Sequence, residues 1–154
     1  MVKSDGIQRL GQGAYWQDLA AGQKFDTFRR TVTETDLVNF ISVTGMLEAI
    51  FIDSTFAGGA MPGRPVPGAL TYTLIEGFIL QSMIQGTGLA MLELHQVIHL
   101  PVHVGDTIHA EIEVTDIRPT SRAGRAVVTS VNRVLNQHGD CVMTYTAKRL
   151  LAGR

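Results

Sequence analysis

The sequence is poor in the features that assign a protein to a class at once. Its 154 residues include one cysteine, Cys141, which excludes an internal disulfide and a metal site made of several thiolates. The 13 basic and 14 acidic residues give a net charge of −1, so no positive excess indicates binding to nucleic acid or to an anionic membrane. The classes that remain are an enzyme acting on small molecules and a binding or assembly subunit.

Long hydrophobic runs are also absent. The least polar stretch, residues 77–92, carries no charged side chain, but it includes Gln81, Gln85 and three glycines. It therefore falls short of the roughly 20 apolar residues that span a bilayer. The first ten residues contain no apolar segment long enough for a signal peptide. We expect a cytoplasmic protein with no membrane segment.

The length of the chain is that of one domain with a core of its own. No internal repeat, low-complexity run or linker divides the sequence. We therefore expect a single domain over residues 1–154, in which residues 1–15 form a loosely ordered N-terminal segment.

The first half of the chain has helical patterning. Residues 33–36, Thr-Glu-Thr-Asp, read as a capping box that uses Asp in place of Glu, and apolar residues follow at helical spacing until Gly45. A second helix is predicted to begin at Pro67 and Gly68. Its residues are apolar on nearly every side, which predicts a helix that other elements surround.

The second half of the chain alternates between apolar and polar residues, as strands do. Wrapping an antiparallel sheet around the long apolar helix buries both, so we predict an α+β fold of about five strands around one helix. The outer edges of such a sheet are usually covered by pairing two units, so a dimer is expected. The predicted strands are residues 25–32, 91–104, 108–114, 126–135 and 141–150.

Three histidines recur at four-residue intervals and raise the question of a metal site. His95, His99 and His103 lie in a predicted strand, where residues four apart are about 13 Å from each other. That distance is too long for two ligands of one ion. We predict side chains on the solvent side of the strand and no metal.

Two carboxylates stand in otherwise apolar and small residues between the two helices. Glu48 and Asp53 are the only acidic residues in the segment 40–57. Burial in such surroundings raises the pKa of a carboxyl group, which suits a general acid or base at neutral pH. The alternative is that both side chains cap turns or pair with Arg64.

Several short motifs along the chain occur together. They are Phe40, Thr44-Gly45, Ile50, Asp53, Phe56-Ala57, Pro67-Gly68 and the Pro-Val-His-Val-Gly-Asp-Thr run at 101–107. In these motifs, and over about residues 16–150, the chain resembles the MaoC-like dehydratases, or (R)-specific enoyl-CoA hydratases, of the hot-dog superfamily. The resemblance implies the hot-dog form of the predicted α+β fold.

The resemblance fails at the positions that do the family's chemistry. Met46 stands where the family has its catalytic Asp, and Phe51 where it has its catalytic His; Glu48 and Ala49 replace Asn and Pro. Neither Met nor Phe can exchange a proton. The resemblance therefore implies an acyl-CoA hydratase or dehydratase with an atypical site, in which Glu48 is the acid/base and Asp53 orients it.

The other expected site residues are chosen by their position and chemistry. A backbone N–H at the start of the central helix, at Gly68, is expected to polarise the thioester oxygen. Coenzyme A would enter as part of the substrate, with no separate cofactor. Arg64 is a candidate for a substrate carboxylate, and Arg118, Arg122 and Arg125 are candidates for the coenzyme A phosphates. The residues expected to line the substrate site are Gly45, Met46, Phe51, Arg64, Pro67 and Gly68.

Two other functions remain open at this point. The first is a non-catalytic acyl-CoA-binding subunit that pairs with a paralogue carrying the Asp/His dyad. The second is a hot-dog thioesterase that activates water with a lone carboxylate. The assembly is expected to be a homodimer, a higher oligomer or a heteromer with that paralogue. Glu76, the one charged residue of the central helix, is expected to pair internally or to mark the solvent edge.

Overall fold

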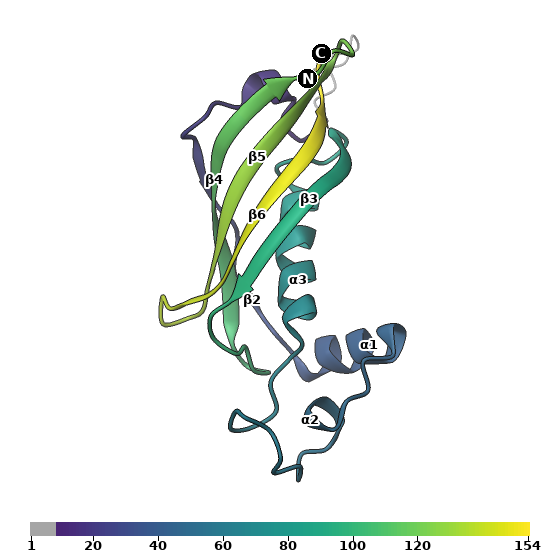
Figure 1. The fold of residues 1–154 in the computed structure, drawn as a ribbon, viewed down its shortest axis with the longest axis vertical. Helices are drawn as coiled ribbons and strands as arrows, with labels where there is room; N and C mark the ends of the chain where they lie inside the picture. The colour runs from purple at the N-terminus through teal and green to yellow at the C-terminus, as the bar shows by residue number, and fades with distance from the viewer. Residues whose placement is uncertain (1–8) are drawn as a thin grey trace.

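The computed structural model describes residues 9–154 and shows a curved sheet with one long helix in its hollow (Figure 1). A short 3₁₀ turn and two short strands precede the helices, and four long strands follow them. The elements in chain order are η1 Trp16–Asp18, β1 Lys24–Asp26, β2 Arg30–Thr31, α1 Glu34–Thr44, α2 Ala49–Ile52, α3 Gly68–Gln81, β3 Gly88–Ile98, β4 Thr107–Pro119, β5 Arg125–Leu135 and β6 Cys141–Ala152.

The six strands form one antiparallel sheet in the order β1-β4-β5-β6-β3, with β2 also paired to β4. The predicted first strand, residues 25–32, is divided into β1 and β2. At the division, the Thr27 N–H donates to the carbonyl of Ala110 at 2.9 Å, while the Thr27 hydroxyl accepts from the Ala110 N–H at 2.9 Å. A side chain thus replaces a backbone group in the ladder, and the regular strand stops there.

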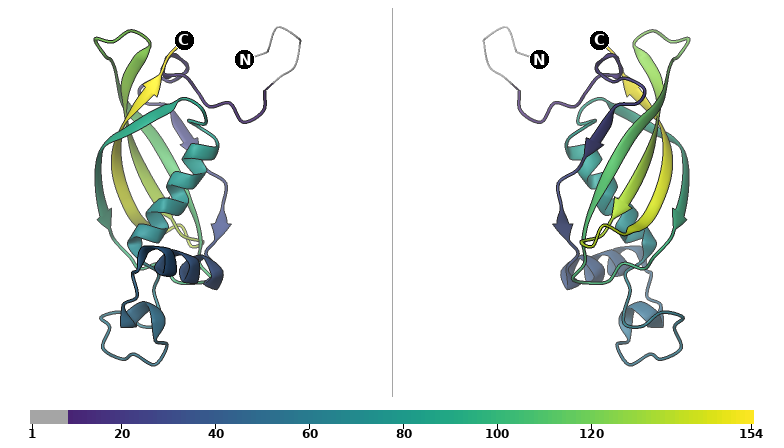
Figure 2. Two further views of the ribbon diagram at one scale, coloured as in Figure 1. Left: turned by 90° about the vertical axis from the view of Figure 1, so that its right-hand side faces the viewer. Right: turned by 90° about the vertical axis from the view of Figure 1, so that its left-hand side faces the viewer.

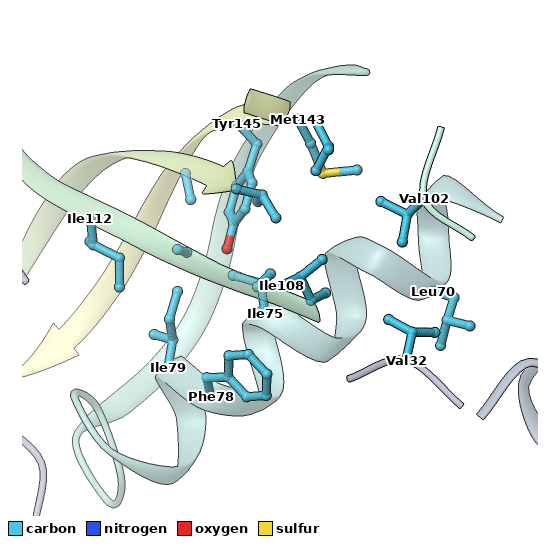
Figure 3. Packing of buried hydrophobic residues seen from close by; sticks show 14 of the residues in the cluster. Val32, Leu70, Ile75, Phe78, Ile79, Val102, Ile108, Ile112, Met143 and Tyr145 are labelled. Atoms are coloured by element: carbon cyan, nitrogen blue, oxygen red, sulfur yellow. The ribbon is translucent and has the colours of Figure 1, made fainter. Parts of the chain in front are cut away.

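The helix α3 begins where Pro67 and Gly68 predict it and runs along the concave face of the sheet (Figure 2). Its buried face contacts apolar residues of β4 and β6, and Figure 3 shows Tyr145 directing its hydroxyl toward the helix. The prediction that the helix is surrounded on every side is wrong, because Leu80 remains 51% exposed. No helix within residues 9–154 is long and apolar enough to span a bilayer.

The helices α1 and α2 and the loop after them project beyond one end of the sheet (Figure 2). The predicted limits of α1 are confirmed. Thr33 is the N-cap, its hydroxyl accepts from the Asp36 N–H at 3.2 Å, and the Asp36 carboxylate accepts from the Thr33 N–H at 2.8 Å. Gly45 ends the helix at φ 72°, a left-handed conformation that glycine adopts without strain.

The capping box predicts an acid-sensitive contribution to stability. Partial burial raises the pKa of Asp36, but the hydrogen bonds from Thr33 and the nearby Arg30 outweigh it and hold that pKa below its usual value of 3.8. A lowered pKa stabilises the fold above pH 4 and loses this effect as pH falls through the folded-state pKa. We expect Asp36→Asn to cost about 1 kcal/mol at pH 7 and less at pH 3, measured by urea unfolding at both values. An equal cost at both pH values would contradict a role for the charge.

The strand β3 is exposed along almost its whole length. The sequence predicts one buried and one exposed face for it, and this prediction is wrong. β3 is the last strand in the sheet order, and its outer edge has no strand partner within residues 9–154. A long apolar strand with a free edge is suited to pairing with another chain. Its exposed apolar side chains are Leu89, Met91, Leu92, Leu94, Val97 and Ile98.

Two residues of the N-terminal segment pair with the loop that follows α3. Gly13 and Ala14 donate backbone hydrogen bonds, each of 2.8 Å, to the carbonyls of Gln85 and Met83. A Cβ at Gly13 would come within 2.4 Å of the Gln85 nitrogen, so the close approach requires glycine. The first eight residues of the segment lie outside the described residues.

Candidate active site

A cavity of about 310 Å³ lies at the N-terminal end of α3, and we call it the slot. The loop that leads into α3 is fixed there because the Val66 N–H donates to the carbonyl of Val102 at 2.8 Å. Gly68 lets the end of β3 approach, since a Cβ at that position would lie 2.4 Å from the Ile98 side chain. The slot is lined by Ile50, Phe51, Met61, Pro65, Val66, Pro67, Gly68, Thr71, Ile98, His99, Leu100, Pro101, Val102, Val142 and Met143.

The slot contains half of the residues expected to bind substrate. Phe51, Pro67 and Gly68 line it, whereas Gly45 and Met46 do not. Gly68 is the first residue of α3, where a backbone N–H has no acceptor within the helix and the helix dipole is positive. The lining is apolar except for Thr71 and His99, and no carboxylate belongs to it in the part of the chain that the structure describes.

Glu48 lies outside the slot with its side chain exposed to solvent. Its carboxylate accepts a hydrogen bond from the Ala49 N–H at 3.1 Å and caps the N-terminus of α2. The expected burial of this carboxyl group is therefore wrong, and the alternative that Glu48 caps a turn is confirmed. The sequence could not reveal this, because exposure depends on what the rest of the fold places over the segment.

Asp53 is exposed as well, at the C-terminal end of α2. Its Oδ1 accepts from the Thr55 hydroxyl at 2.7 Å and from the Thr55 N–H at 2.9 Å. These two hydrogen bonds lower the pKa of Asp53, whereas the sequence predicts a raised pKa. Asp53 borders a separate open hollow together with Arg64, but Arg64 pairs with Glu34. The expected pairing of Arg64 with Glu48 or Asp53 is therefore wrong.

The arginines expected to bind the coenzyme A phosphates lie away from the slot, and the described histidines form no metal site. The loop that carries Arg118, Arg122 and Arg125 is at the opposite end of the sheet from α2 (Figure 1), and Arg118 pairs with Asp116 at 2.9 Å. His99 shares a hydrogen bond of 3.0 Å with the hydroxyl of Thr144. No three His, Cys, Asp or Glu side chains gather as metal ligands among residues 9–154.

A buried polar cluster beside α3 was not foreseen as a whole. Glu76 accepts hydrogen bonds from Arg149 and, at 2.8 Å, from the Tyr145 hydroxyl, so its internal pairing is confirmed. Arg149 also donates to the Ser130 hydroxyl at 3.0 Å. Burial and the negative charge of Glu76 both raise the pKa of the Tyr145 phenol. The signal in the sequence was an Arg at an inward-facing position of the last strand, where apolar residues otherwise alternate.

A curved antiparallel sheet around a central helix, with an apolar slot at the start of that helix, defines a hot-dog protein. A protein of Mycobacterium tuberculosis with a double hot-dog fold matches 96% of this chain over 46% of its own, with a TM-score of 0.82 at 22% identity. That likeness concerns the fold alone.

The chain belongs to the MaoC-like domain family, whose model matches residues 17–137. It is 30% identical to the (R)-specific enoyl-CoA hydratase of Aeromonas caviae over 129 residues, which are 83% of this chain and 92% of the relative. The crystal structure of a MaoC-like dehydratase from Rhodospirillum rubrum matches 92% of this chain and 99% of its own, with a TM-score of 0.83 at 27% identity. The family predicted from the sequence motifs is thereby confirmed.

Proposed function

We propose that this chain binds an acyl thioester in the slot and is the non-catalytic member of a hydratase or dehydratase assembly of hot-dog units. The observation that carries the proposal is the lining of the slot, which holds apolar side chains and Phe51 where the family's histidine would stand. Such a lining takes up an acyl chain and offers no carboxylate to deprotonate water, and a ring nitrogen of its one histidine, His99, is engaged by the Thr144 hydroxyl at 3.0 Å. Coenzyme A enters as part of the ligand, and no further cofactor is needed.

The start of α3 supports the binding of the thioester. The N–H of Gly68 borders the slot, so a thioester oxygen placed there would meet a donor and the positive end of the helix dipole. In a catalytic unit the same contact would stabilise an enolate. In this chain it would orient the ligand.

The free edge of β3 supports an assembly. Ile98 both lines the slot and lies exposed at the end of that edge, so a second hot-dog unit paired there would also shield the slot from water. The second unit is either another copy of this chain or a paralogue that carries the Asp/His dyad. The second possibility accounts for a chain that has kept the slot without the dyad.

A second candidate is a lyase that uses Glu48. One observation favours it: Glu48 caps the short helix α2, and the next residues of that helix, Ile50 and Phe51, line the slot. In this reaction Glu48 would take a proton from water as the oxygen bonds to the β-carbon of an enoyl thioester. The same carboxyl group would then return the proton to the α-carbon. Asp53 would orient Glu48 from the other end of α2.

The two candidates differ in what the purified chain does alone with crotonyl-CoA. The first predicts that butyryl-CoA binds, as measured by calorimetry, and that crotonyl-CoA is not hydrated. Hydration is measured as the loss of enoyl-thioester absorbance. The second predicts hydration that Glu48→Gln lowers by about 10²-fold or more, with Glu34→Gln as the matched control. Release of free thiol would instead indicate a thioesterase. Failure to bind butyryl-CoA would overturn both candidates.

A further inference from the structure

The wall of the slot contains one buried polar side chain, that of Thr71, which is 2% exposed. Its hydroxyl has no hydrogen-bond partner among residues 9–154, whereas the hydroxyl of Thr73 on the same helix donates to the carbonyl of Leu70 at 3.0 Å. The Thr71 hydroxyl is not one of the polar atoms that the described chain encloses completely, so the part of this residue that stays accessible includes its hydroxyl. Buried polar groups normally have a partner, and here a ligand in the slot can supply it.

Thr71 and Gly68 lie on one side of α3. They are three residues apart, a spacing that brings two residues to the same side of a helix, and they are the α3 residues of the lining. The helix rises about 1.5 Å per residue, so Thr71 lies about 4.5 Å beyond Gly68 along the axis. A ligand held by the N–H of Gly68 and extended along the helix therefore passes Thr71.

The sheet opposite Thr71 presents apolar side chains. Val142 and Met143 are consecutive residues of β6, yet both line the slot. The register between β5 and β6 shifts at this point and leaves Val142 as a bulge, which re-aims a side chain and interrupts the alternation of the strand. The other polar residue of the lining, His99, is engaged by Thr144. Among the residues that line the slot, Thr71 thus offers the polar side chain that no neighbour engages.

We propose that Thr71 makes this chain select acyl thioesters with an oxygen atom on the third carbon, as in a 3-hydroxyacyl or a 3-ketoacyl group. This inference rests on the proposed binding of an acyl thioester with its carbonyl at Gly68. The third carbon is separated from the carbonyl carbon by two C–C bonds of about 1.5 Å each, and a hydrogen bond between oxygens spans about 2.8 Å. An oxygen on that carbon can therefore reach a hydroxyl about 4.5 Å further along the helix than the Gly68 N–H.

The same hydroxyl disfavours an acyl group without that oxygen. The methylenes of a saturated chain would displace water from Thr71 and leave its hydroxyl buried without a partner, which is costlier than one hydrogen bond is favourable. A site built around a hydrogen bond rejects an analogue that cannot form it for this reason. The Thr71 hydroxyl can donate to a ketone, and it can donate to a hydroxyl or accept from one. This selection needs no catalytic base, so a non-catalytic unit can perform it.

Calorimetric binding of acetoacetyl-, 3-hydroxybutyryl- and butyryl-CoA tests the role of Thr71, because these acyl groups have the same length and differ at the third carbon. For the unaltered chain, we expect the better of the two oxygenated ligands to bind about tenfold more tightly than butyryl-CoA. The comparison between those two ligands tells whether the ketone or the hydroxyl is preferred.

Thr71→Val removes the hydroxyl and keeps a branched side chain of similar size. We expect it to abolish the tenfold preference, because the oxygenated ligand loses its partner and butyryl-CoA no longer buries an unpaired hydroxyl. Thr71→Ser keeps the hydroxyl and should keep the preference. Thr73→Val is the matched control, since it makes the same change on the same helix outside the slot, and it should leave the preference unaltered.

The outcomes separate this inference from the function on which it rests. If none of the three ligands binds to the unaltered chain, the proposed function fails and the selection by Thr71 fails with it. If butyryl-CoA binds at least as tightly as both oxygenated ligands, only the selection is overturned. The same holds if Thr71→Val is folded by circular dichroism and keeps the preference. Thr71→Ala, which also removes the hydroxyl, serves where the valine variant does not fold.

Discussion

Replacing Arg149 by methionine is expected to lower the free energy of unfolding by about 3–5 kcal/mol. The Arg149 and Glu76 side chains are only 8% and 12% exposed, so the substitution would leave the Glu76 carboxylate in the interior without its counter-charge. The Tyr145 hydroxyl would remain as its one hydrogen-bond donor among the described residues. One neutral donor does not replace a guanidinium, and the cost follows from the unpaired charge.

The double variant Glu76→Leu with Arg149→Met separates the charge from the packing. Two apolar side chains of similar size leave no buried charge, so we expect the double variant to regain most of the stability that Arg149→Met loses. Urea unfolding followed by circular dichroism measures all three chains. Losses that simply add in the double variant would show that the two residues do not act as a pair.

The second large effect is expected at Phe78, whose side chain is 2% exposed on the sheet side of α3. Phe78→Ala removes a ring from the centre of the core and should cost about 3–5 kcal/mol, since the surrounding elements can fill the space only in part. The ring also lies against Phe28, with the centroids 4.3 Å apart.

Phe28→Ala is the matched control for this variant. Phe28 is 54% exposed, so the same change of residue removes much less buried surface and should cost clearly less than Phe78→Ala. Thermal unfolding of both variants under one set of conditions gives the comparison. Equal losses at the two positions would mean that the sheet side of α3 is not the centre of the core.

The elements that local chemistry determines could be predicted from the sequence. The capping box at Thr33 and the left-handed Gly45 limit α1, and Pro67 starts α3, because each acts within one helical turn. The strand β3 could not be predicted in the same way. Its apolar residues indicate burial, but no element within residues 9–154 covers them, so the alternation does not tell which face of the strand is buried.

The candidate site shows the same division between local and distant causes. Phe51, Pro67 and Gly68 could be predicted because the family motifs contain these positions, Phe51 in α2 and the other two at the start of α3. The exposure of Glu48 and Asp53 could not, since both lie in a segment that projects from the sheet (Figure 2). Arg149 was missed because its partner, Glu76, is 73 residues away in the sequence.

The free edge of β3 also has a consequence for the expression of this protein. A chain whose β3 is left unpaired exposes an apolar edge strand that can pair with the same strand of another copy. Aggregation then competes with correct association. If the proposed assembly forms through β3, synthesis matched to that of the pairing unit would keep the strand covered from the moment the chain folds.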